Sequence, residues 1–156
     1  MNNGKFRKLP IVWLSTIPVT SYNRDRLKSG NLNMNVKNVI NQLKSQYPGK
    51  PIIKNNKGEP TEILCEIDPT KNHPGYSLAI AVIDKSTPHY HKKLKEEYRI
   101  IRGNLILHVD NRVIRLKHGE KHIILPYQIH WAEGNQTWIE CRSEPGWVIE
   151  DHIFSN

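Results

Sequence analysis

The sequence has few of the residues that stabilise small secreted proteins or that cross membranes. Only two cysteines, Cys65 and Cys141, occur in 156 residues, and neither belongs to a C-x-x-C pair. Two cysteines are too few for a disulfide scaffold, so we expect free thiols in a reducing compartment. No uninterrupted apolar run approaches the roughly 18–20 residues that span a bilayer. These absences argue against a disulfide-rich domain and a membrane protein, and they favour a cytoplasmic protein.

A secretory signal peptide is not expected either. Basic residues at positions 5–8 precede an apolar run from Leu9 to Val19, which superficially copies the layout of such a peptide. However, Pro10 and Pro18 interrupt the run, and no Ala-x-Ala cleavage site follows it.

Acidic residues are scarce in the first 60 positions, which carry 11 Lys or Arg and only 2 Asp or Glu. Residues 61–156 carry 12 and 13, so the basic character belongs to the N-terminal part. A basic arm can bind nucleic acid or another acidic partner. Here the positive charges are scattered and no nucleic-acid motif accompanies them. We therefore favour a solvated extension over a nucleic-acid site, with an acidic partner as the alternative.

One stretch, residues 35–47, has helical periodicity. Its apolar residues recur at the i, i+3, i+4, i+7 spacing of an amphipathic helix, and Pro48-Gly49 ends it. The positions are Val36, Val39, Ile40, Leu43 and Tyr47. No second helix is predicted beside it, so a helix-turn-helix is not expected.

From Thr61 onward the sequence changes to short β-rich runs separated by turns. Tyr76 to Ile83 is strongly apolar and suits a central strand, and Asp110-Asn111 is a tight hairpin signal. Several short strands at near-regular spacing indicate an all-β sandwich or barrel. We therefore expect a basic extension over residues 1–60, with a helix near 35–47, followed by a β-barrel over 61–156.

The most informative stretch is residues 86–103, STPHYHKKLKEEYRIIRG. His89 and His91 are one residue apart, so on a strand both imidazoles leave the same face. Glu96 opens the next apolar run, and His130 is a further candidate downstream. Three imidazoles and a carboxylate suit one divalent transition metal such as Fe, Mn, Ni or Zn. Glu97 is the rival carboxylate, and strand alternation points the two glutamates to opposite sides, so only one of them can face the histidines.

This stretch resembles the first signature of the cupin superfamily, G-x5-H-x-H-x(3,4)-E-x6-G. Residues 119–130 resemble the second, G-x5-P-x-G-x2-H-x3-N, through Gly119 and His130. One departure is Tyr127, which occupies the place of the inner glycine of the second signature. The residues that match the first signature are His89, His91, Glu96 and Gly103.

The resemblance implies a double-stranded β-helix, which is a jelly-roll barrel. It also implies that His89, His91, Glu96 and His130 are metal ligands. An extended apolar piece, Ile11 to Leu14, is expected to lie on its own barrel or on that of a second subunit. Exchange of N-terminal strands across a dimer is common in cupins, so the resemblance implies a homodimer.

Three further residues are candidates for catalysis. Tyr98 shares the face of Glu96, so its phenol could act on a substrate, or it could simply fill the barrel. Glu140 and Arg142 share a face with Trp138. They could line a polar pocket or form a solvated outer pair.

These observations favour a metal-dependent enzyme with a small-molecule substrate. Cupins with three histidines and a glutamate include isomerases and dioxygenases, so the resemblance points to such chemistry on a small polar sugar-like or acid metabolite. The fold carries many unrelated reactions, which leaves a non-catalytic, metal-stabilised binding module as the alternative.

Overall fold

The computed structural model describes residues 33–155. The expected extended piece, Ile11 to Leu14, lies outside the described residues. Strands dominate this part of the chain, and helix α2 (Val36–Gln46) precedes them. A short 3-10 helix, η1 (Ile149–Asp151), precedes the last strand. The strands are β1 (Ile52–Lys54), β2 (Glu62–Asp68), β3 (Ser77–Lys85), β4 (His89–Tyr90), β5 (Lys95–Arg102), β6 (Asn104–Val109), β7 (Arg112–Lys117), β8 (Lys121–Ile124), β9 (His130–Glu144) and β10 (Ile153–Phe154).

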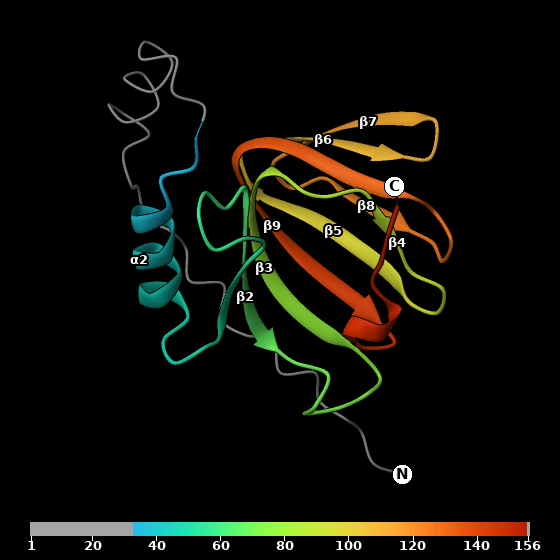
Figure 1. Ribbon diagram of the computed structural model, residues 1–156, viewed down its shortest axis with the longest axis horizontal. Coiled ribbons are helices and arrows are strands. Elements are labelled where there is room, and N and C mark those ends of the chain that lie inside the picture. The colour runs from blue at the N-terminus through green and yellow to red at the C-terminus, as the bar shows by residue number, and fades with distance from the viewer. Residues whose placement is uncertain (1–32, 156) are drawn as a thin grey trace. The chain divides into compact units, whose positions relative to one another are not determined.

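The strands form one antiparallel sheet that curls around an interior (Figure 1). One path through the sheet runs β1-β2-β3-β9-β4-β10; β5 and β6 also pair with β9, β8 pairs with β5, and β7 pairs with β6. Strand β1 pairs with β2, so the sheet continues across the boundary that we expected near residue 60. The curled sheet confirms the predicted class, a mainly-β barrel with one short helix before it.

The longest strand, β9, connects the parts of the barrel. Its first residues pair with β6, and its later residues pair with β3 on one side and β5 on the other. His130, at its start, is also paired with His89 of β4. Because one strand has four neighbours, segments distant in sequence meet at one end of the barrel.

An irregularity divides β9 into two halves with different inward-facing positions. His130 faces the interior in the first half, whereas Ile139 and Ser143 do so in the second. The inward positions are therefore even-numbered before the irregularity and odd-numbered after it. Gln136 lies between the halves with a φ of 47°, outside the extended region of a regular strand. This shift decides which polar side chains of β9 reach the site.

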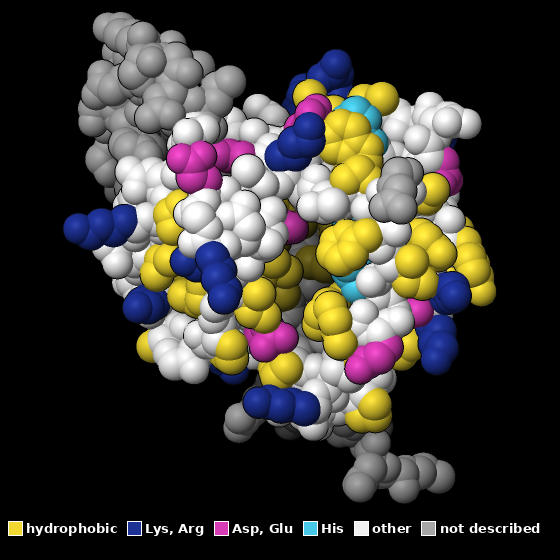
Figure 2. Space-filling model, viewed as in Figure 1, with side chains coloured by type: hydrophobic (Ala, Val, Ile, Leu, Met, Phe, Trp, Pro, Cys, Tyr) yellow, Lys and Arg dark blue, Asp and Glu magenta, His cyan; other side chains and the backbone are white. Residues whose placement is uncertain are grey.

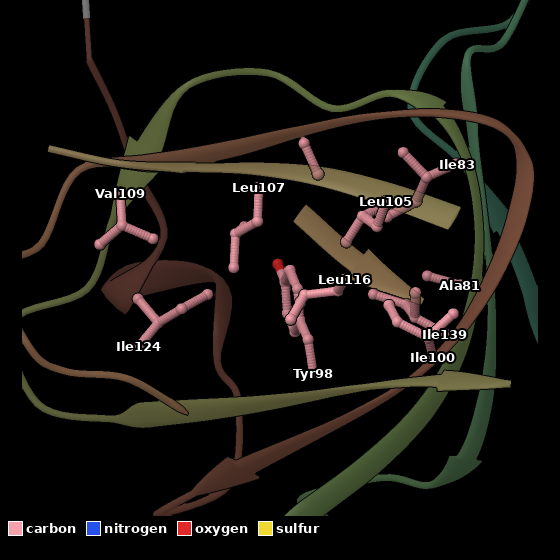
Figure 3. Packing of buried hydrophobic residues seen from close by; sticks show 11 residues of the cluster. Ala81, Ile83, Tyr98, Ile100, Leu105, Leu107, Val109, Leu116, Ile124 and Ile139 are labelled. Atoms are coloured by element: carbon pink, nitrogen blue, oxygen red, sulfur yellow. The ribbon is translucent and has the colours of Figure 1, made fainter. Parts of the chain in front are cut away.

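Apolar side chains fill the barrel between the strands (Figure 3). A buried cluster of this kind is the main favourable term in folding, because it removes apolar surface from water. Its members are Ala81, Ile83, Tyr98, Ile100, Leu105, Leu107, Val109, Leu116, Ile124, Ala132 and Ile139.

Helix α2 packs on the outer side of the sheet, beside β2 and β3 (Figure 1). Its buried residues Val39 and Leu43 belong to a second apolar cluster with Ile63 and Trp138. The side chain of Asn35 accepts a hydrogen bond from the backbone N–H three residues later, which caps the helix. The helix expected near residues 35–47 is thus confirmed.

Three smaller expectations also agree with the structure. Asp110 and Asn111 form the turn between β6 and β7, with Asp110 at a φ of 52°. Cys65 and Cys141 are free thiols. Within residues 33–155, no helix is long and apolar enough to cross a membrane.

Candidate metal centre

The four predicted ligands meet at one end of the barrel. His89 belongs to β4, Glu96 to β5, and His130 begins β9, while His91 directly follows β4. All four side chains are buried, and one ligand atom from each lies within 4.8 Å of the others. The structure therefore brings together the complete set that the sequence pattern indicates.

The three imidazoles are oriented by hydrogen bonds from Nδ1 to the backbone. A carbonyl oxygen can only accept, so each Nδ1 carries a proton and each Nε2 is left to face the cluster. The acceptors are the carbonyl of Thr87 for His89 (2.8 Å), that of Asp151 for His91 (2.8 Å) and that of Gln128 for His130 (3.0 Å).

The Glu96 carboxylate lies among the imidazoles. Its Oε2 is 3.1 Å from His130 Nε2, and its Oε1 is 3.6 Å from His91 Nε2. Ser143 Oγ donates to Oε1 at 3.3 Å, and Cys141 Sγ does so at 3.7 Å. Burial alone would raise the pKa of Glu96, but His130 and His91 keep it well below its ordinary value. The carboxylate is therefore ionised, as a metal ligand must be.

Two features of the cluster fit a bound cation. Burial, together with His130 and His152, lowers the pKa of His89 to about 3, so its Nε2 has a free lone pair at neutral pH. His91 Nε2 is buried without a hydrogen-bond partner, which is costly unless something occupies that direction. A divalent transition metal bound to the imidazoles and the Glu96 carboxylate would satisfy both groups. This donor set is compatible with Fe, Mn, Ni and Zn alike.

The side chains of Glu96 and its neighbour Glu97 point in different directions. Glu97 points away from the interior, and its Oε2 lies 3.2 Å from Lys121 Nζ. Strand alternation is the physical reason, because adjacent residues of a strand point to opposite faces.

The sequence left open whether Tyr98 acts on a substrate or fills the barrel, and its position is compatible with both. It is buried in the apolar cluster, and it also lines the cavity beside the predicted ligands. Its ring centroid is 6.2 Å from that of His130. Burial and the Glu96 carboxylate raise the pKa of Tyr98 well above its ordinary value, so the phenol keeps its proton and can donate a hydrogen bond.

Glu140 and Arg142 are not brought to the cluster. Arg99 Nη2 donates to Glu140 Oε1 at 2.7 Å, and Arg142 Nη2 donates to Glu144 Oε1 at 2.8 Å, all on the outer face of the sheet. A straight β9 that continued the alternation from its first residue would have turned both inward; the irregularity described above prevents this. The prediction of a polar pocket lining is therefore corrected to the solvated outer arrangement.

A cavity of about 310 Å³ adjoins the cluster. The polar groups that line it include His89 and Glu96 of the cluster, and Glu62 and Glu66 on β2. Figure 2 shows a hollow on this face, bordered by hydrophobic and acidic side chains, with histidine atoms inside it. Such a concave, mainly apolar space with a few polar groups is typical of small-molecule sites. Its apolar lining includes Leu64, Leu78, Ala79, Ala81, Ile139, Trp147, Ile149 and Phe154.

Solved cupin-fold proteins resemble this chain. The nucleoside dehydratase Pac13 from Streptomyces matches with a TM-score of 0.59 and 10% identity, over 69% of this chain and 88% of its own. KdgF from Halomonas sp. matches at 0.51 and 17%, over 58% and 85%. HppE with FeII matches at 0.53 and 11%, over 62% and 56%. The chain has a cupin fold.

No protein-family model matches the sequence, and no curated protein does either. The cupin assignment therefore depends on the structure and on the local signatures. At such low identities the likeness concerns the fold, and function has to be argued from the site.

The cupin fold tolerates the departure at Tyr127. This residue has a φ of 67°, in the left-handed region that glycine adopts most easily. Its side chain is exposed, and its backbone N–H donates to the carbonyl of His91 at 2.6 Å. The turn thus keeps a glycine-like backbone and a direct link to the segment that carries a predicted ligand.

Sequence reasoning missed Asp151 as a support of the centre. Its buried carboxylate accepts hydrogen bonds from the backbone N–H groups of residues 92–94, just after His91. The next residue, His152, stacks on His89 with ring centroids 4.0 Å apart. These residues are about 60 positions from the histidines they support, so no local pattern could have indicated them.

Glu62 is a second missed residue. Its carboxylate lines the cavity, and burial together with the Glu96 charge raises the pKa of Glu62 to about 7. A signal for it existed, because Glu62 and Glu66 alternate with apolar residues and must share one face of a strand.

Proposed function

We propose that this protein is a metal-dependent enzyme that acts on a small polar molecule in the cavity, with isomerase or dioxygenase type chemistry. One observation carries the proposal: three imidazole Nε2 atoms and one carboxylate converge on one point beside a cavity of ligand size. A purely structural histidine cluster would not need to adjoin such a space.

The protein's own residues would prepare the site for this chemistry. Backbone carbonyls fix the tautomers of His89, His91 and His130, so the ligand geometry exists before any ion arrives. Tyr98 keeps its proton and can donate it in a hydrogen bond to a substrate oxygen. A bound divalent ion would supply a Lewis acid that polarises such an oxygen. Glu140 and Arg142 are left out of this catalytic group because they lie on the outer face.

The structural neighbours support an enzyme that uses a small ligand. Pac13 is a nucleoside dehydratase that has been crystallised with uridine, and HppE has been crystallised with FeII. Both observations are compatible with a hydroxylated substrate and a divalent metal in the present site.

The first test is elemental analysis of untagged protein purified anaerobically without added metal. We expect one divalent transition metal at near-stoichiometric content. Iron would direct a turnover screen to O2 consumption with small diols and acids, and manganese, nickel or zinc would direct it to isomerisation of hydroxylated compounds. Metal binding without turnover in either screen would contradict the enzymatic proposal and favour the binding module. Failure to bind any such ion on titration would remove the metal centre itself.

A further inference from the structure

The cavity is asymmetric in charge. At the side formed by β2, the carboxylates of Glu62, Glu66 and Asp68 all line it. Among residues 33–155, no lysine or arginine contributes to its lining. On the opposite side lies the predicted metal centre, whose net charge with a divalent ion and one carboxylate is positive.

These carboxylates differ in whether they already have hydrogen-bond or ion-pair partners. Asp68 accepts from Asn72 and Tyr76, and its Oδ2 is 2.6 Å from His73 Nε2. The side chains of Glu62 and Glu66 make no hydrogen bond or ion pair with a described residue. Lys50 reaches the C-terminal end of β2, but its Nζ donates to the Ile67 carbonyl. Glu66 therefore offers acceptor oxygens to a ligand on the β2 side, and Glu62, whose pKa burial and the Glu96 charge raise to about 7, offers them when it is ionised.

Between the two polar sides the lining is apolar. Leu64 lies between Glu62 and Glu66 on β2, and Ala79, Ala81 and Ile139 continue the wall toward β9. Small alanine side chains leave room there for the body of a ligand. A compound that fills this space has to place its own polar groups at the two ends.

We propose that the cavity selects a compound with three parts: an oxygen donor that binds the metal centre at one end, an apolar body, and an uncharged or positively charged hydrogen-bond donor at the other end. At this second end, Glu62 and Glu66 exclude carboxylates and phosphates. A hydroxyl or ammonium group would satisfy their acceptor oxygens, whereas an anion would be desolvated beside like charges. A site built to pair with a donor also rejects analogues that lack it. The inference rests on the proposed function for the metal end. Within the expected substrate classes, it disfavours the acidic one.

The test uses linear hydroxamic acids, in which the hydroxamate is the metal-binding head. At each of several chain lengths, compounds ending in an ammonium, a hydroxyl and a carboxylate are compared. Affinities for the Zn2+-loaded full chain are measured by calorimetry above pH 7, where Glu62 is ionised, after Zn2+ binding itself has been measured by competition with a chromophoric chelator. We expect the ammonium and hydroxyl compounds to bind at least tenfold more tightly than the carboxylate at the length that reaches β2. The double variant Glu62→Gln, Glu66→Gln should reduce that preference to less than about twofold, and Glu97→Gln, on the outer face, should preserve it.

The outcomes separate the two proposals. Equal affinity of the three end groups at every length, with Zn2+ bound, would overturn the charge selection and leave the metal centre intact. A preference that survives in the double variant would also overturn it, because the two carboxylates would not be its cause. Absence of Zn2+ binding would instead contradict the proposed function.

Discussion

The two faces of strand β5 carry adjacent glutamates with opposite results. On the inner face, Glu96 is buried between His91 and His130, and the histidines keep it ionised. On the outer face, its neighbour Glu97 pairs with Lys121, and Arg99 pairs with Glu140, in contact with water. Solvent screens the outer pairs, whereas burial makes each inner charge depend on its partners. Burial, more than the identity of the residues, therefore separates a candidate reactive centre from an ordinary surface.

The largest effect should follow removal of an inner ligand. His91→Ala should weaken binding of Zn2+ by more than the 10–100-fold that loss of an outer-shell partner typically costs. The barrel should stay folded, because its main apolar cluster does not include His91. Competition with a chromophoric chelator measures the affinity, and circular dichroism checks the fold. The control is His118→Ala, which changes an exposed histidine on a turn. Unchanged Zn2+ affinity in His91→Ala would contradict the assignment of the inner cluster as the metal site.

The adjacent residues Glu96 and Glu97 allow the inner and outer faces to be compared directly through Zn2+ affinity. Glu96→Gln should lower Zn2+ affinity on the order of 100-fold, since it replaces a charged ligand by a neutral one. Glu97→Gln should change it by less than about twofold, because that side chain faces Lys121 on the outside. The same chelator competition measures both. The reverse ranking would mean that the inner and outer faces have been exchanged.

A third prediction concerns pH and an inner carboxyl without a partner. Because the folded state raises the pKa of Glu62 from 4.5 to about 7, the stability that Glu62 contributes is complete below pH 4.5 and lost as the pH rises toward 7. Metal-free wild type should therefore lose on the order of 2 kcal/mol relative to Glu62→Gln between these values, with a plateau above. Urea unfolding of both proteins across this range measures it. Wild type that instead gained on the variant as the pH rose would contradict the placement of Glu62.

The smallest effect is expected on the outer face. Glu140→Gln breaks an exposed pair with Arg99 and should cost less than about 1 kcal/mol of unfolding free energy. Zn2+ affinity should stay at the wild-type value. A large loss of metal binding would show that Glu140 belongs to the site after all.

Local sequence patterns were sufficient to indicate the four clustered residues. Strand alternation gives His89 and His91 a common face, and Glu96 and His130 match the cupin signatures. Helix α2 and the Asp110 turn were also predictable from their own residues. The orientation of Glu140 and Arg142 could not be predicted, because an irregularity of β9 at Gln136 changes the inward-facing positions from even-numbered to odd-numbered residues.

Contacts between distant segments explain what else was missed. The Asp151 carboxylate supports the loop after His91 across about 60 residues, and only the folded chain brings the two together. The position of Glu62 in the cavity lining could be recognised only in the folded chain, although its alternation with apolar residues was visible in the sequence.

X-ray absorption spectroscopy of the Zn2+-loaded full chain tests the inner centre most directly. The structure predicts only nitrogen and oxygen ligands at about 2.0–2.1 Å, with the outer-shell scattering of three imidazoles. Cys141 lies near Glu96 but is not among the four clustered residues. A sulfur ligand at about 2.3 Å, or scattering from fewer than two imidazoles, would contradict the assignment of His89, His91, Glu96 and His130.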